Sequence, residues 1–497
     1  MVLIRRSLVV VATCLFISAC GGGGGAASST TVPTGVAAVG APISAGTLSA
    51  IDVNGLTAST SIADDGTYSI NFLTSLRTPI LLRADGVSGG RSVVHFGVIT
   101  RSTDTTVNVT PVSTAVVAQV MQADPGVVFA AADTSKIALL TTTQVSGTNT
   151  IIGNALSAAR TAAGIAGSGS LDFLNTAFTA DKTGLDKLLD LVKVSVQPDR
   201  SVQLKNKTAD GVTTVSSGGT VSGNLGTVES IDTAGIDELG RAMEASFANG
   251  APGWRNRSQS VLDLFSTNFL HGGEDRIAVI TSIASEADDM ADARFLRAKV
   301  LNCATIGSSP VCEALFTVKY TDGSFEPFIF PVIRESGAWK IYGNQAPVTT
   351  DYSPVVCGTM FGHNAPVTRS GFNLEIFDNA RIGGVLVGYV KVWFGAATGS
   401  PEFVLVNPAK ASGVCGGNEG YFEILPDITD ETTCTGNFAE LSNSRIDQLR
   451  ASFATARPKM TVRYYNTSGN WISNAEHVIT IEALPLKSSE VSDGYFA

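Results

Sequence analysis

The sequence predicts a multidomain, mostly β protein with an α+β portion, in the order β-sandwich, helical segment, α+β domain and C-terminal β-sandwich. Three observations predict this class. The 497 residues exceed the size of one ordinary domain. The 51 glycines, together with abundant threonine and valine, favour strands and turns. The hydrophobic period changes along the chain from that of a strand to that of a helix and back again.

Composition and charge exclude whole classes of partner. Hydrophobic residues make up 44% of the chain, which is enough to build packed cores and excludes bulk disorder. The formal net charge is −10, and loss of a leader that contains Arg5 and Arg6 makes the remaining chain more acidic still. No basic run with interleaved aromatic residues occurs in the sequence. Such a chain should not bind nucleic acid or anionic lipid surfaces.

Residues 1–19 have the pattern of a secretory signal peptide. Arg5 and Arg6 form a short positive segment, and the apolar segment Leu8–Phe16 is too short to span a bilayer. Paired arginines also occur in twin-arginine signals, but plain valines follow here, which favours an ordinary positive segment. The alternative is a buried N-terminal helix, and the Gly21–Gly25 run directly after the leader argues against it.

The end of this leader, Ile17–Cys20, resembles the lipobox of bacterial lipoproteins. The resemblance implies cleavage before Cys20, a diacylglyceryl thioether on its sulfur, and acylation of the new amino group by a fatty acid such as palmitate. Two or more buried acyl chains hold a protein stably on a membrane. Gly21 stands where aspartate would favour the inner membrane, so the resemblance implies the outer membrane, on its periplasmic or its cell-surface face. Residues 20–33 form a Gly/Ser tether with a reach of roughly 20 Å.

Residues 34–110 are predicted to form a β-sandwich. Asn54-Gly55 is a hairpin signal, and Asp64–Tyr68 combines a turn with the start of a strand. Gly40–Ile43 and Asp64–Tyr68 resemble the turns of the carboxypeptidase regulatory-like, or transthyretin-like, β-sandwich. The resemblance implies a structural or adhesive module without chemistry of its own. The two aspartates of the second turn are also candidate Ca²⁺ ligands, but acids in such a position are commonly turn formers.

Residues 111–230 are predicted to be a helical domain that ends in a hairpin and a linker. Asp124-Pro125 is the pattern of a helix N-cap followed by proline in the first turn. The apolar residues between Leu185 and Val192 follow the spacing of a buried helix face. A hairpin is expected over Val202–Val215, and the serine- and glycine-rich segment Ser216–Gly226 is expected to be the linker.

Residues 231–347 are predicted to be an α+β domain, because the helical segments Ile236–Ala248 and Ser258–Leu270 precede a series of strands, one of them over Phe325–Glu335. The segment Gly337–Gln345 is similar to the last strand of NTF2-like cone folds. The similarity implies a cone-like domain that is able to hold a pocket with acid–base residues. The polar candidates for that pocket are His271, Asp275, Glu326 and Arg334. The alternative for the first two is a helix C-cap followed by a solvated turn.

Residues 348–497 return to strand patterns, and a second β-sandwich is expected there. Phe372–Phe377 and Val385–Phe394 alternate apolar and polar residues. Thr461–Tyr465 and His477–Ala483 are expected to pair across a long turn.

Cysteine spacing predicts disulfides. No CxxC pair is present, no histidine stands at zinc-binding spacing, and an exported chain meets an oxidising compartment. Cys303 and Cys312 flank a short segment between two strand-like runs and are expected to form a disulfide. The two runs, Phe295–Val300 and Leu315–Tyr320, are expected to pair antiparallel, with the cysteines at the closed end of the pair. Cys415 with Cys434 is the nearest remaining pair. Cys357 is then left over, or pairs between chains.

No catalytic pattern occurs elsewhere in the sequence. Gly86–Gly90 matches GxSxG, but a nucleophile elbow needs a helix after it, and a strand-like run follows here, so a glycine-rich turn is expected. No HExxH, Walker or dinucleotide-binding motif is present. The histidines that a motif would have to use are His95, His271, His363 and His477. We therefore expect no metal and no cofactor.

These observations favour a membrane-anchored, exported lipoprotein that acts without catalysis as a binding or structural module of the cell envelope, with a protein or glycan ligand. The alternative is a small-molecule-binding or hydrolytic protein that uses a pocket in residues 231–347. A deep pocket with converging ionisable groups there would favour the alternative. A filled interior would favour the binding module.

Overall fold

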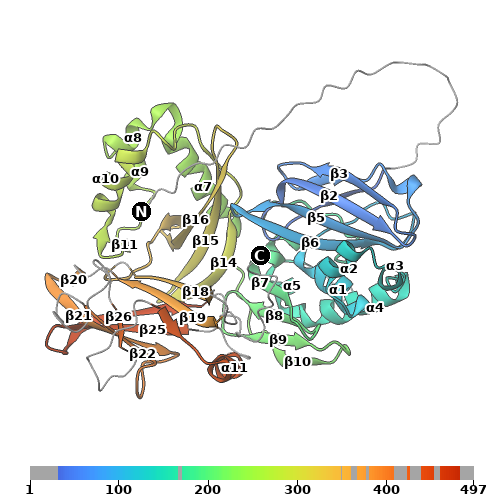
Figure 1. Ribbon diagram of the computed structural model, residues 1–497. Coiled ribbons are helices and arrows are strands. Elements are labelled where there is room, and N and C mark those ends of the chain that lie inside the picture. The colour runs from blue at the N-terminus through green and yellow to red at the C-terminus, as the bar shows by residue number, and fades with distance from the viewer. Residues whose placement is uncertain are drawn as a thin grey trace.

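The computed structural model of the protein describes residues 32–165, 171–348, 350–359, 367–376, 380–407, 423–425, 438–452 and 459–481. Over these residues the protein is multidomain and mostly β, as predicted, and its sheets are built from antiparallel strand pairs. Figure 1 shows the regions in chain order: blue sheets, a cyan helical region beside them, a green-to-yellow region of helices and strands, and orange-to-red sheets.

The N-terminal region consists of a four-stranded sheet in the order β3-β2-β5-β6 and a two-stranded sheet of β1 and β4. Apolar side chains of both sheets share one buried core, which includes Leu48 and Tyr68. The predicted turn forms at Asn54-Gly55, between β2 and β3. The bounds are β1 Thr34–Val36, β2 Ser44–Asp52, β3 Thr57–Ile62, β4 Thr67–Ser69, η1 Leu73–Ser75, β5 Ile80–Ser88 and β6 Arg91–Ile99.

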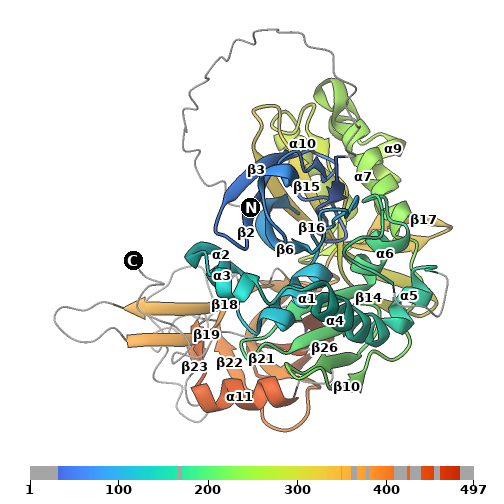
Figure 2. The same ribbon diagram turned by 90° about the vertical axis from the view of Figure 1, so that its right-hand side faces the viewer.

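A helical region follows and covers β6. In Figure 2 helix α1 lies directly below β6, and Val112 and Val116 of the helix share a buried core with Phe96 of the strand. Asp124 caps α2 by accepting hydrogen bonds from two backbone N–H groups, with Pro125 in the first turn, as predicted. The described helices are α1 Pro111–Met121, α2 Pro125–Ala131, α3 Thr134–Ile137, α4 Thr142–Ala155, α5 Ser157–Ala162 and α6 Gly184–Leu191.

A small antiparallel sheet in the order β10-β9-β8-β7 follows α6. The hairpin predicted over Val202–Val215 is confirmed as β8 and β9. The linker predicted over Ser216–Gly226 is wrong, because part of it forms β10 and pairs with β9. The backbone groups of β9 need partners, and this segment supplies them despite its turn-like composition. The bounds are β7 Val192–Val196, β8 Val202–Asn206, β9 Val212–Val215 and β10 Val221–Asn224.

Helices and then a larger antiparallel sheet make up the next region. Strand β15 is central and pairs with β13, β14 and β16, and β16 pairs with β17. Strand β16 has the bounds that the sequence predicts. The elements are α7 Thr233–Phe247, η2 Ala248–Gly250, α8 Pro252–Arg255, α9 Gln259–Leu262, β11 Leu270–His271, β12 Glu274–Asp275, α10 Arg276–Glu286, β13 Arg294–Phe295, β14 Lys299–Ile306, β15 Ser309–Lys319, β16 Phe325–Glu335 and β17 Ala338–Ile341.

The helix predicted over Ser258–Leu270 is wrong in length, because only the single turn α9 is helical. Phe265 instead forms a parallel bridge with Ile341, and the N–H of Ser266 donates to the carbonyl of that same isoleucine over 2.8 Å. Phe265 and Phe269 are nevertheless buried. The apolar spacing therefore identified the buried side chains, while backbone pairing with β17 decided the local conformation.

Cys303 and Cys312 face each other across β14 and β15, and their sulfur atoms lie 2.09 Å apart, at the distance of the predicted disulfide. The strand pair expected over Phe295–Val300 and Leu315–Tyr320 is present, but β14 and β15 continue through both cysteines and turn only at Gly307 and Ser308. The pair therefore lies within the ladder and not at its closed end. The backbone N–H of Cys303 also donates to the carbonyl of Lys207 over 2.5 Å, which ties β14 to the smaller sheet.

We expect Cys312→Ser to lower the free energy of unfolding by about 2–3 kcal/mol, because the bridge closes a loop in the unfolded chain and both cysteines are buried. Urea unfolding of the oxidised protein and the variant measures this difference. Cys357→Ser is the matched control for loss of a thiol. Free thiols at both positions in non-reducing peptide maps, or a bridge from either one to another cysteine, would contradict the pairing.

The last region contains two antiparallel sheets, and in Figure 2 the β18–β19 pair extends away from the rest of it. Phe372, Val390 and Tyr464 belong to one buried core there. The described elements are β18 Thr350–Thr359, β19 Val367–Ile376, β20 Arg381–Ile382, β21 Val385–Phe394, β22 Phe403–Val406, β23 Glu423–Leu425, β24 Phe438–Glu440, α11 Asn443–Ser452, β25 Lys459–Asn466 and β26 Trp471–Thr480.

Two features of this region differ from the strand pattern of the sequence. Helix α11 lies among the strands, and its Ile446 and Leu449, three residues apart, contribute to the same core as the sheets. The turn between β25 and β26 is short, because Trp471 already begins β26. Within the described residues, no helix is long and apolar enough to cross a membrane.

Candidate functional site

The four polar residues considered for a pocket in residues 231–347 are not brought together. Asp275 caps α10 by accepting a hydrogen bond from the N–H of Ala278 over 2.9 Å. Glu326 accepts a hydrogen bond from the hydroxyl of Tyr320 over 2.5 Å. Arg334 forms an ion pair with Asp232. Glu326 and Arg334 lie on the same strand eight residues apart, which corresponds to about 26 Å.

His271 is not in a helix C-cap, as one interpretation of the sequence had it. It is the last residue of β11, and it pairs with Glu274 of β12 across a turn at Gly272 and Gly273. Both glycines have positive φ, which allows the tight turn. His271 and Asp275 are exposed, so this hairpin belongs to the surface.

Aromatic side chains occupy the space between the helices and the sheet of this region. The rings of Phe247 and Trp254 stack with centroids 4.8 Å apart, and Phe265 meets Trp254 edge-on at 6.1 Å. Phe295 and Phe316 of the sheet continue the cluster. All five side chains are buried. Such packing stabilises the region and fills the space between its helices and its sheet.

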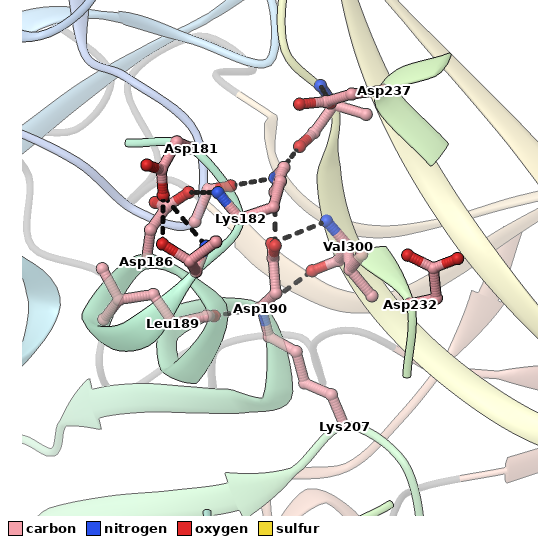
Figure 3. Close-up of polar contacts among 12 residues, drawn as sticks. Asp181, Lys182, Asp186, Leu189, Asp190, Lys207, Asp232, Asp237 and Val300 are labelled. Carbon is pink, nitrogen blue, oxygen red and sulfur yellow. Dashed lines mark hydrogen bonds and ion pairs between the residues drawn. The ribbon is translucent and has the colours of Figure 1, made fainter. Parts of the chain in front are cut away.

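The densest set of buried charges lies elsewhere, at the junction of the N-terminal sheets, the helical region and the larger sheet (Figure 3). The ammonium of Lys182 is 3.0 Å from the carboxylate of Asp190, and both side chains are almost fully buried. Lys182 also donates to the backbone carbonyls of Gly40 and Ala298. These residues come from three regions of the chain, so a single buried cation links all three.

Two further carboxylates surround this cation. Asp186 accepts a hydrogen bond from the backbone N–H of Lys182 over 2.8 Å, and Asp237 accepts one from the N–H of Ala298 over 2.9 Å. Asp190 also lies 3.3 Å from the N–H of Val300, which donates to it. Figure 3 shows these carboxylates gathered around the lysine. The helical region and strand β14 are thereby joined through charged hydrogen bonds, which are stronger than neutral ones.

The cluster changes the acidity of its members. Burial raises the pKa of Asp186 to about 7, although Lys182 opposes the shift. Burial also raises the pKa of Asp237. Burial alone would lower the pKa of Lys182, but the neighbouring carboxylates, Asp190 first, outweigh it and raise the pKa above its ordinary value. Lys182 is therefore charged at neutral pH.

Gly40 is required where it stands. Its φ is +88°, and a Cβ on it would lie 2.5 Å from the carboxylate oxygen of Asp190. A glycine alone accommodates both the backbone conformation and the close approach. Gly40 begins the Gly40–Ile43 turn that the sequence singled out for a family resemblance. The turn thus has a local physical role at this junction.

Lys207 reinforces the same junction from the smaller sheet. Its ammonium donates to the carbonyl of Leu189 over 2.8 Å and to that of Val300 over 2.7 Å. A lysine ammonium has three donors, and Lys182 uses all of its own on one carboxylate and two carbonyls. A lysine held in this way has no lone pair for nucleophilic chemistry. The cluster is therefore a structural cross-link.

The remaining residues singled out in the sequence have local roles. Gly86–Gly90 lies in the hairpin of β5 and β6, so it is the expected glycine-rich turn and no nucleophile elbow. Asp65 accepts hydrogen bonds from the N–H and hydroxyl of Thr67, and these bonds lower the pKa of its carboxyl. Asp64 pairs with Lys319. No group of three metal-binding side chains occurs in the described part of the chain.

The histidines and the other cysteines complete this account. His95 is half-buried, with its Nδ1 3.1 Å from the hydroxyl of Thr114, and its desolvation lowers its pKa to about 4. Burial likewise lowers the pKa of His477 to about 4. The other residues named in the sequence, namely Cys20, His363, Cys415, Cys434 and the side chain of Cys357, lie outside what the structure describes.

Sequence reasoning missed the cluster around Lys182. A signal was present: Lys182, Asp186 and Asp190 are spaced four residues apart, next to the leucines of α6. That spacing places charges in a row along one side of a helix. Taken alone it indicates a solvated helix face, and only the partners Gly40 and Ala298, more than 100 residues away, reveal burial.

Comparison with known proteins gives no family for this chain: neither a protein-family model nor a curated protein matches it.

Proposed function

We propose that the protein is an exported lipoprotein, anchored through lipid on Cys20, that acts without catalysis as a binding or structural module of the cell envelope. The observation that carries the proposal is the leader sequence, in which a positive segment and a short apolar segment end in Ile-Ser-Ala-Cys. The Gly/Ser tether that follows suits a folded body held near a membrane surface. The outer membrane is the proposed location, on either face.

The finer architecture belongs to the same proposal. Residues 34–110 are proposed to be a carboxypeptidase regulatory-like β-sandwich, residues 231–347 an NTF2-like domain, and residues 348–497 a second β-rich module. The buried sheet core around Leu48 and Tyr68 supports the first assignment. The helices that precede the antiparallel strands β13–β17 support the second.

A rigid binding scaffold has more support than a pocket enzyme. One continuous hydrophobic core runs from Val36 to Ile341, and the cluster around Lys182 ties the same regions together through charges. Aromatic rings fill the interior in which an NTF2-like pocket would lie, and the polar candidates there are separated on the surface. A fixed arrangement of this kind is suited to presenting a surface or cleft to a ligand.

Replacement of Cys20 tests the anchor. We expect Cys20→Ser to abolish incorporation of labelled palmitate and to leave a longer, unprocessed precursor, because the thioether and the cleavage both depend on that sulfur. Fractionation of wild-type cells should place the protein with the outer membrane. Cys14→Ser, within the leader, is the matched control and should mature normally. A Cys20→Ser protein that still takes up palmitate and matures would refute the lipoprotein assignment.

A further inference from the structure

An open cleft lies where the N-terminal sheets meet the helical region. It has a volume of about 560 Å³, which lies within the range of small-molecule sites. The two-stranded sheet β1–β4 forms its floor, the edge strand β3 and residues 106–108 border it, and Ala177 and Phe178 of the helical region close the other side. The cleft is distinct from the buried cluster around Lys182, since the two share no residue.

The lining of the cleft is polar and uncharged. It contains seven hydroxyl-bearing residues and two asparagines, and it contains no aspartate, glutamate, lysine, arginine or histidine. Most of the hydroxyls make no hydrogen bond to the described part of the protein, which leaves them available to a ligand. The lining residues with polar side chains, apart from Tyr68, are Thr34, Thr60, Ser61, Thr67, Ser69, Asn71, Thr106 and Asn108.

Asn108 supplies a second, independent observation. Its side chain is fully buried, and its Nδ2 donates to the carbonyls of Thr176 over 2.7 Å and Phe173 over 3.4 Å. These two bonds fix the orientation of the amide. Its Oδ1 is left without a hydrogen-bond partner among the described residues. A buried acceptor without a donor is unfavourable, and Asn108 is one of the residues that line the cleft, so a donor that enters beside it would satisfy this oxygen.

The chemistry of the cleft selects a class of ligand. A charged ligand would need an opposite charge in the lining, and none is present. The net charge of −10 also disfavours anions over a longer range. Neutral hydroxyls and amides pair well with hydroxyl groups, and Phe178 offers an apolar surface for the C–H face of a ring.

We infer that this cleft binds a neutral saccharide. The inference rests on the proposed function and names a ligand site for the binding module. A hydroxyl of the sugar donates to Oδ1 of Asn108, its other hydroxyls pair with the threonines and serines of the lining, and its ring packs on Phe178. The volume of the cleft, its neutral polar lining and the unpaired Oδ1 of Asn108 all favour this class of ligand.

Saturation-transfer NMR and titration test the inference, using the full mature chain in micelles of a detergent without a sugar headgroup. The probes are maltotriose, cellotriose, chitotriose and mannotriose, with trigalacturonate as the anionic comparison. We expect at least one neutral trisaccharide to bind with a dissociation constant on the order of micromolar to millimolar. We expect trigalacturonate to bind at least about tenfold more weakly.

Ser61→Leu and Asn71→Leu place apolar bulk in the cleft at exposed positions, so neither disturbs the fold. Each should weaken binding of the neutral sugar about tenfold or more. Ser59→Leu is the matched control, because Ser59 is an exposed serine on the same face of β3 outside the cleft. The affinity of the Ser59→Leu protein for the neutral sugar should stay within about twofold of the wild-type value.

Absence of binding by all four neutral sugars, a preference for the anionic one, or equal affinity in Ser61→Leu and Ser59→Leu would overturn the inference. Preferential binding of a neutral extended peptide along the edge of β3 would overturn it as well. A negative result in these binding experiments would not contradict the proposed lipid anchor, because palmitate labelling at Cys20 tests the anchor separately.

Discussion

Lys182→Met should lower the free energy of unfolding by about 3–5 kcal/mol at neutral pH. Lys182 is buried, and its ammonium is the cation shared by Asp190, Asp186 and Asp237. Methionine nearly preserves the volume but leaves three carboxylates close together with their neutralising charge removed. It also leaves the carbonyls of Gly40 and Ala298 without the donor that now satisfies them.

Urea unfolding followed by tryptophan fluorescence measures this effect, since the buried Trp254 and Trp339 report on the region that contains Ala298. Limited proteolysis provides a second readout, because the N-terminal sheets should become easier to separate from the rest. Lys187→Met is the matched control: Lys187 lies on α6, five residues after Lys182, and is half-buried, with its ammonium donating to the hydroxyl of Ser230. Equal stabilities for the two variants would show that the cluster does not hold the regions together.

Asp186→Asn should be more stable than wild type at pH 8, and this advantage should be smaller at pH 5. Burial raises the pKa of Asp186 to about 7, from an ordinary value of 3.8. Its Oδ1 has no hydrogen-bond partner, while its Oδ2 accepts from the N–H of Lys182. Asparagine keeps that acceptor and removes one of the negative charges that faces Asp190 and Asp237.

The sign of this pH dependence follows from the number of protons that the folded and unfolded states bind. Between about pH 4 and pH 7 the folded protein holds a proton on Asp186 that the unfolded chain has released. The contribution of this group to stability is therefore complete below about pH 4 and is lost as the pH rises through 7. The Asp186→Asn protein does not lose stability in this way, because asparagine does not titrate. Its advantage over wild type should grow by about 2–3 kcal/mol between pH 5 and pH 8.

Unfolding by urea at both pH values measures the difference. His95 and His477 titrate in the same range, with folded pKa values of about 4, but they are present in both proteins and cancel in the comparison. Asp289→Asn, at an exposed position, is the control. A difference between Asp186→Asn and wild type that does not change with pH would mean that Asp186 stays ionised in the folded protein.

Local signals in the sequence predicted the elements whose conformation is decided locally. The Asn54-Gly55 turn and the Asp124-Pro125 cap form because their residues satisfy nearby backbone groups. Strand β16 forms at the bounds that were predicted for it, Phe325–Glu335. The disulfide pair Cys303–Cys312 belongs to the same class, because the two cysteines are only nine positions apart in the sequence.

Distant pairing decided the elements that the sequence predicted wrongly. The segment after Ser258 has helical spacing, but Phe265 pairs with Ile341 of β17. The segment after Ser216 has the composition of a linker, but β9 offers it a strand edge. In both cases the partner strand lies outside the stretch of sequence from which local structure is predicted. The backbone hydrogen bonds that this strand supplies outweigh the local conformational propensity.

The same distinction applies to the candidate sites. The cluster around Lys182 joins residues from positions 40 to 300, so no stretch of sequence contains it. The cleft beside β1 and β4 is equally dispersed, from Thr34 to Phe178. Its threonines and serines are common in any β-rich sequence. Only their convergence around the unpaired oxygen of Asn108 distinguishes them.

The contacts of Lys182 also determine when the protein can finish folding. A chain is made and emerges from its N-terminus, and the core of the N-terminal sheets is complete once residue 109 has appeared. Lys182, by contrast, must wait for the carbonyl of Ala298, which follows 116 residues later. Until then Lys182 and the two aspartates of α6 lack part of their partners. The helical region should therefore become fully protease-resistant only after residue 298 has emerged, later than its own place in the sequence suggests.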